Sequence, residues 1–87
     1  MSETDIKADV TVDARGAACP GPLMDLIGKM KDVDAGTVVE LLTGDEGSKN
    51  DVPEWVAEAG HELVDVVDVG EYWAIYVEKT YILTGSV

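Results

Sequence analysis

Residues 13–23 read Asp-Ala-Arg-Gly-Ala-Ala-Cys-Pro-Gly-Pro-Leu and join an alternating, strand-like segment to a segment with helical spacing. They contain the one cysteine of the chain, Cys19, and two of its three prolines. Proline disfavours helical backbone in the residue before it, but it is tolerated in a first helical turn, where its missing N–H would have no partner. We therefore expect Cys19 to be the N-cap, or the residue just before it, of a helix that begins at about Pro20 or Pro22.

The position predicted for Cys19 favours ionisation of its thiol. A helix N-terminus carries about half a positive charge, and the thiolate is the nucleophilic form of cysteine. Arg15 would add a second positive influence if the loop folds back. From these residues alone, a buried and inert cysteine is the alternative, because most free cysteines behave as small hydrophobic side chains.

The flanking patterns predict a strand, a helix and a second strand. Apolar residues alternate with polar ones from Ala8 to Ala14, which is typical of a half-buried strand. Apolar residues at helical spacing follow from Leu23 to Met30, and we expect Gly36 to end this helix. Residues 37–43 are β-branched and mostly apolar, which predicts a central strand, parallel to the first.

The second half of the chain predicts a short helix and a hairpin. Asp51 is expected to cap the second helix after a polar loop at 44–49, because Glu54 follows it at capping-box spacing. Residues 61–68 and 72–79 read as two strands that are joined through 69–71. The order βαβαββ, with both helices on one face, predicts a two-layer α/β (α+β) sandwich.

The totals favour one small domain over residues 1–87, with a disordered start at 1–7 and a tail of uncertain structure at 81–87. Eighteen acidic residues against six basic ones give a net charge of −12, spread over the whole chain. Without a basic patch, nucleic-acid binding is disfavoured. The charge suggests a halophilic protein, since concentrated salt screens self-repulsion, and an acidic protein from ordinary salt is the alternative.

The location that we expect is the cytoplasm. The sequence has neither an apolar run long enough to span a bilayer nor a signal-peptide pattern, so we expect no membrane insertion. A single cysteine also forms no internal disulfide, which suits a reducing compartment.

Several kinds of catalytic site are disfavoured by the residues present. One cysteine and one histidine offer too few ligands for a typical metal site, so we expect no metal and no cofactor. A thioredoxin-type redox motif needs a second cysteine, where this chain has Pro22. His61 could pair with a cysteine nucleophile, but a structural or exposed histidine is the favoured interpretation, with at most a minor role.

The pattern Asp-Ala-Arg-Gly-x-x-Cys-Pro-x-Pro at 13–22 resembles the signature of the TusA/SirA family of small sulfur carrier proteins. Two further stretches resemble the same family, namely Asn-Asp-Val-Pro-Glu-Trp at 50–55 and Gly-His-Glu-Leu at 60–63. The similarity spans about residues 10–79. It implies a mixed four-stranded sheet under two helices, with the motif cysteine exposed at the start of the first helix.

The resemblance also implies a function and a set of site residues. Cys19 takes the position of the family cysteine, which accepts sulfur as a persulfide and passes it to a partner protein. The motif residues that would position it are Asp13, Arg15, Gly16, Pro20 and Pro22.

We therefore expect a monomeric, sulfurtransferase-like carrier that relays sulfur between proteins. The donor would be a cysteine desulfurase or a rhodanese-like protein, and the acceptor a protein of tRNA thiolation or of another biosynthesis that requires sulfur. Two alternatives are a non-catalytic regulatory or interaction module and a redox sensor in which the Cys19 thiol is oxidised.

Overall fold

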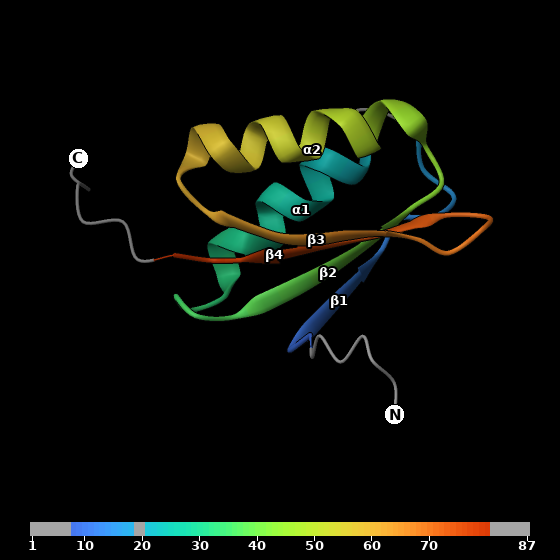
Figure 1. Ribbon diagram of the computed structural model, residues 1–87. Coiled ribbons are helices and arrows are strands. Elements are labelled where there is room, and N and C mark those ends of the chain that lie inside the picture. Colours follow the sequence, from blue (N-terminus) through green and yellow to red (C-terminus); the bar gives the residue numbers. More distant parts are fainter. Residues whose placement is uncertain (1–7, 19–20, 81–87) are drawn as a thin grey trace.

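A computed structural model describes residues 8–18 and 21–80, so the expectations for residues 1–7 and for the tail at 81–87 lie outside the described residues. The elements follow the predicted order βαβαββ. They are β1 (Val10–Asp13), α1 (Gly21–Asp32), β2 (Val38–Thr43), α2 (Glu46–Ala59), β3 (Glu62–Asp68) and β4 (Trp73–Glu78). Both helices lie on one face of the sheet, which confirms the two-layer sandwich (Figure 1).

The four strands form one mixed sheet in the order β1-β2-β4-β3. β1 and β2 are parallel, and Val10 is in register with Val39. β4 runs antiparallel to both of its neighbours, β2 and β3. The prediction of a central second strand is confirmed, because β2 lies between β1 and β4.

The core lies between the sheet and the two helices. Alternating residues of β2 are buried because its inner face points toward α1 and α2. Leu26 of α1, Leu41 of β2 and Val52 of α2 are completely buried. The remaining large members of this cluster are Met30, Val39, Val56, Ile75 and Val77. Burial of this apolar surface is the main source of stability for so small a chain.

α1 starts where the sequence indicated but ends earlier. Its first residue, Gly21, lies between the two motif prolines, and Pro22 is buried in the first turn. The expectation that Gly36 ends the helix is wrong, because α1 ends at Asp32. Gly36 has a φ of 93° and occupies a tight turn into β2, in which the N–H of Thr37 donates to the carbonyl of Asp34 at 3.1 Å.

α2 starts six residues earlier than the capping-box spacing predicted. The prediction that Asp51 caps this helix is wrong, because the N-cap is Asp45 and Asp51 lies inside α2. One carboxylate oxygen of Asp45 accepts bonds from the backbone N–H of Ser48, at 2.9 Å, and from its hydroxyl, at 3.0 Å. Ser48 is fully buried, so this cap satisfies polar groups that water cannot reach. Pro53 therefore lies inside α2 and not in its first turn.

The last two strands form the predicted hairpin. The N–H of Val69 donates to the carbonyl of Tyr72 at 2.9 Å, and Gly70 has a φ of 108° in the turn. The ladder between β3 and β4 shifts register between Leu63 and Asp65, which leaves Val64 as the extra residue of a bulge. β3 forms one edge of the sheet, and Val64 is exposed there.

Candidate functional site

The predicted catalytic residue, Cys19, and Pro20 after it lie outside the described residues, so the exposure and ionisation of the thiol stay predictions. The chain on either side of them is ordered by backbone bonds. The N–H of Ala17 donates to the carbonyl of Ala14 at 3.1 Å, and the N–H of Gly21 donates to the carbonyl of Ala18 at 2.7 Å. Ala14 is buried and Ala18 is exposed, so the loop after β1 leads from the core to the surface.

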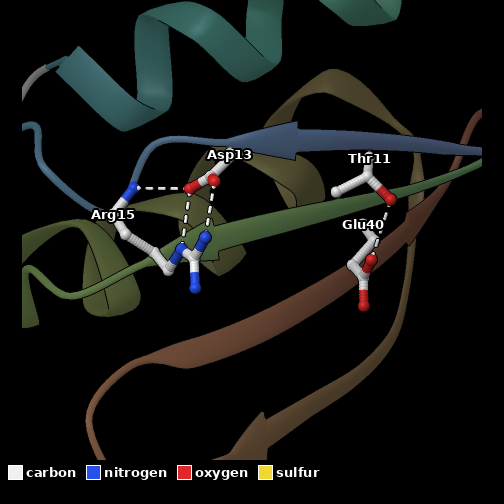
Figure 2. Close-up of polar contacts among 4 residues, drawn as sticks. All are labelled: Thr11, Asp13, Arg15 and Glu40. Carbon is white, nitrogen blue, oxygen red and sulfur yellow. Dashed lines mark hydrogen bonds and ion pairs between the residues drawn. The ribbon is translucent and has the colours of Figure 1, made fainter.

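Asp13 and Arg15 form a two-pronged ion pair at the end of β1. Figure 2 shows the guanidinium facing the carboxylate, with Nε to Oδ1 at 2.8 Å and Nη2 to Oδ2 at 2.7 Å. The backbone N–H of Arg15 also donates to Oδ1 of Asp13, at 3.2 Å. These bonds to Arg15 lower the pKa of the Asp13 carboxyl to about 2, and the same pairing raises the pKa of Arg15.

Arg15 also contacts the connection between β3 and β4. Its guanidinium carbon lies 5.0 Å from the centre of the Tyr72 ring, a cation–π distance. Tyr72 directly precedes β4 and lies in the connection from β3 to β4. The loop after β1 is thus joined by its arginine to the hairpin.

An open cleft of about 520 Å³ lies at this end of the sheet. In Figure 1 the loop after β1, the link from β2 to α2 and the β3–β4 hairpin meet there. The residues that line the cleft are Asp13, Arg15, Gly16, Gly44, Glu71 and Tyr72. Three of these are motif residues, so the structure brings Asp13, Arg15 and Gly16 together with residues from two other segments.

Gly44 lies where the two sides of the cleft come close. A Cβ atom on Gly44 would lie 3.5 Å from the carbonyl oxygen of Arg15 and 3.7 Å from that of Glu71. These are ordinary contact distances, so a Cβ at this position would touch both backbones and occupy the space between them.

The charge of Arg15 is matched by that of Asp13, and Glu71 adds a further negative charge to the lining. About half of each side chain in the ion pair is exposed, 48% for Arg15 and 52% for Asp13. A neutral pair has a weaker long-range field than a single cation. Arg15 therefore acts on the loop more through its contacts than through an excess of positive charge.

A second polar cluster lies on the face of the sheet that the helices leave uncovered. The carboxylate of Glu40 accepts bonds from the hydroxyl of Thr11, at 2.9 Å, and from the phenol of Tyr76, at 2.7 Å. Figure 2 shows Glu40 beside Thr11 across the β1–β2 pair. The bond to Glu40, together with burial, raises the pKa of Tyr76 to about 12.

Sequence reasoning missed Tyr72, Glu40 and Gly44 as members of these clusters. Tyr72 precedes β4 and Tyr76 lies within it, and the structure gives both tyrosines polar partners. The partners themselves, Glu40 and Arg15, come from β2 and from the loop after β1, and no short-range pattern connects those segments to β4.

His61 lies at the other end of β3 from the hairpin. β3 has seven residues, so about 23 Å of strand separates His61 from the turn at about 3.3 Å per residue. Its Nδ1 accepts a bond from the N–H of Thr80 at 3.3 Å, and its ring centre lies 5.6 Å from that of Trp55. Burial, with a smaller effect of Lys79, lowers the pKa of His61. The structure does not bring His61 near Asp13 or Arg15.

Two further findings concern metal ligands and the length of the helices. Within residues 8–18 and 21–80, no three side chains of histidine, aspartate or glutamate gather closely enough to hold a metal ion. Neither α1 nor α2, the two helices that the structure describes, is long and apolar enough to cross a membrane.

Comparison with known proteins gives consistent matches. The family model described as "Sulfurtransferase TusA" matches residues 10–79. An Archaeoglobus fulgidus protein, named as a candidate sulfur carrier, is 57% identical over 70 residues, which are 80% of this chain and 96% of the relative. The sulfur carrier protein TusA of Pseudomonas entomophila is 30% identical over 76 residues, 87% of this chain and 95% of the relative.

The fold matches a solved structure as well. The crystal structure of a SirA-like protein from Desulfitobacterium hafniense superimposes with a TM-score of 0.73, covering 83% of this chain and 99% of that one, at 19% identity. At that identity the likeness shows the fold alone. The family-model match and the sequence relatives carry the assignment, and they show that this chain belongs to the TusA family of sulfur carrier proteins.

Proposed function

We propose that this protein carries sulfur as a persulfide on Cys19. The observation that carries the proposal is the position of the one cysteine inside a TusA motif, in a chain that matches the family over residues 10–79. A carrier of this kind requires one nucleophilic thiol and no cofactor. No second cysteine is present to attack the persulfide and expel its sulfur as sulfide.

The transfer involves no net oxidation. The Cys19 thiolate attacks the outer sulfur of a donor persulfide, an S–S bond forms on Cys19, and the donor thiolate leaves with the electron pair of the broken bond. An acceptor thiolate then attacks the outer sulfur on Cys19, and the Cys19 thiolate is the leaving group. Each step exchanges one S–S bond for another.

The motif residues position the thiol in this proposal. Asp13 and Arg15 fix the start of the loop through their ion pair, and Gly16 lines the cleft beside them. Pro20 and Pro22 restrict the backbone around Cys19, because each fixes its own φ and limits the residue before it.

The partners are proteins. The donor is a cysteine desulfurase or a rhodanese-like protein, and the acceptor serves tRNA thiolation or another biosynthesis that requires sulfur. The protein acts as a monomer in the cytoplasm. With a net charge of −12, it favours partners with a basic docking face, and its association rates fall as salt screens the attraction.

Mass spectrometry of the intact protein tests the proposal. The protein is incubated with a cysteine desulfurase and cysteine, and the added mass of one sulfur atom is measured before and after treatment with a reducing thiol. We expect wild-type protein to gain a sulfur that the thiol removes, and Cys19→Ser to gain none. Equal loading of Cys19→Ser, or no loading of the wild type by persulfide or thiosulfate donors, would contradict the proposal.

A further inference from the structure

Tyr72 lies outside the sulfur-carrier motif, yet it contacts the motif directly. Its ring lies under the guanidinium of Arg15, 5.0 Å from ring centre to the guanidinium carbon. Arg15 has little freedom of its own, because Asp13 holds two of its nitrogens. A shift of Tyr72 would therefore act on the loop from Ala14 to Ala18.

The hairpin holds Tyr72 in a defined place. Its carbonyl accepts the N–H of Val69 at 2.9 Å, and the N–H of Gly70 donates to a carboxylate oxygen of Asp68 at 2.9 Å. The next residue, Trp73, is paired in register with Thr43 of β2 and Asp68 of β3. The ring of Tyr72 is thus mounted on the sheet, whereas the loop that it contacts is not part of any strand or helix.

We propose that Tyr72 is a positioning residue for sulfur transfer, acting through Arg15 to fix the loop that leads to Cys19. The inference rests on the proposed function and adds the β3–β4 hairpin to the transfer site. Neither Tyr72 nor Arg15 belongs to the hydrophobic core, so their contact contributes to the geometry of the cleft rather than to the packing between sheet and helices. Small displacements of a reacting group cost large factors in rate, which is how such a contact affects transfer.

The chain offers a matched control for this contact. Lys49 of α2 lies over the ring of Trp73, with Nζ 5.3 Å from the ring centre. This second cation–π pair involves the neighbouring residue in sequence, but it joins α2 to β4 and does not involve the loop after β1. Lys49→Met removes one cation–π contact of the same kind without touching Arg15.

The test compares Tyr72→Leu, Tyr72→Phe and Lys49→Met in single-turnover sulfur loading over a range of donor concentrations. We expect Tyr72→Leu to lower the maximal loading rate on the order of tenfold, below the roughly hundredfold cost of a 1 Å misplacement, with little change in the half-saturating donor concentration. Tyr72→Phe keeps the ring and restores the rate, and Lys49→Met loads as wild type. Wild-type rates for Tyr72→Leu, an equal loss for Lys49→Met, or no recovery in Tyr72→Phe would overturn the inference.

A second measurement needs no donor, and it separates the inference from the proposed function. The N–H of Ala17 is bonded to the carbonyl of Ala14, so its hydrogen exchange reports on the loop. Tyr72→Leu should speed this exchange, while Tyr72→Phe and Lys49→Met leave it unchanged. If Cys19 carries no sulfur, the proposed function fails, and the exchange of the Ala17 N–H alone decides whether Tyr72 fixes the loop. Unchanged exchange of this N–H in Tyr72→Leu would overturn the inference.

Discussion

Arg15 holds the loop after β1 through contacts with two different side chains. Its guanidinium is shared between the Asp13 carboxylate and the Tyr72 ring. The motif made both Asp13 and Arg15 candidate site residues, and the structure places them side by side. Tyr72 could not be predicted, because its contact with Arg15 depends on β4 lying beside β2, which places the start of β4 at the same end of the sheet as the end of β1.

The Glu40–Tyr76 bond leads to a prediction about tyrosine ionisation. Of the three tyrosines in the chain, Tyr76 should ionise at about pH 12, because its phenol donates to the Glu40 carboxylate. Ultraviolet titration of tyrosinate measures this step. Glu40→Gln removes the negative charge and should lower the pKa of Tyr76, and Tyr76→Phe should remove the step at pH 12.

The same bond predicts the direction of a stability change. The pKa of Tyr76 is higher in the folded protein than the ordinary value of 10.0, so its contribution is fully present below pH 10 and is lost as the pH rises toward 12. A Tyr76 that titrates near pH 10 in the folded protein would contradict both the bond and this pH dependence.

At the scale of elements, the N-terminus of α2 shows why local patterns locate helices better than their ends. Asp51 and Glu54 have capping-box spacing, and Pro53 suits a first turn, so the sequence favours a start at Asp51. Asp45 provides an alternative cap whose partner, Ser48, is buried. Burial of Ser48 is a property of the packed molecule, and it favours the earlier start at the cost of a proline inside the helix.

The assignment of the cap is tested by two alanine substitutions. Asp45→Ala should lower the free energy of unfolding by about 1–2 kcal/mol, because it removes the cap and both bonds to Ser48. Asp51→Ala is the matched control and should cost less, since Asp51 is not the cap of α2. Urea denaturation measures both values. A larger loss of unfolding free energy for Asp51→Ala than for Asp45→Ala would contradict Asp45 as the cap and favour a helix start at the capping box.

At the scale of the whole molecule, the fold followed from the sequence pattern more fully than the site did. The βαβαββ order, with β2 as an inner strand, could be predicted from three local patterns. These were the alternation in the strands, the helical spacing of apolar residues and the hairpin signal. The cleft could not be predicted, because it forms where three segments meet, at Gly16, Gly44 and Glu71. No periodicity in the sequence relates such segments to one another, because the order of the strands in the sheet is what brings them together.

The net charge of −12 predicts that salt stabilises the folded protein. Adding NaCl from about 0.1 M to 1 M shortens the Debye length from about 10 Å to 3 Å and screens repulsion among the acidic side chains. We expect the midpoint of thermal unfolding to rise over this range, with most of the gain at the lower concentrations.

Sucrose at equal osmolality is the control for this salt effect, because it is excluded from the surface without screening charge. An equal rise in sucrose, or a midpoint that does not respond to NaCl, would argue against charge repulsion as the cause.

The bulge at Val64 bears on how the protein behaves when many copies crowd together. An edge strand with an unbroken, regular outline is a template on which a neighbouring copy can add its own strand. The extra residue in β3 interrupts that outline and increases the local twist, and the opposite edge strand, β1, has only four residues. Both features disfavour the addition of a strand from a second copy at the edges of the sheet that the structure describes.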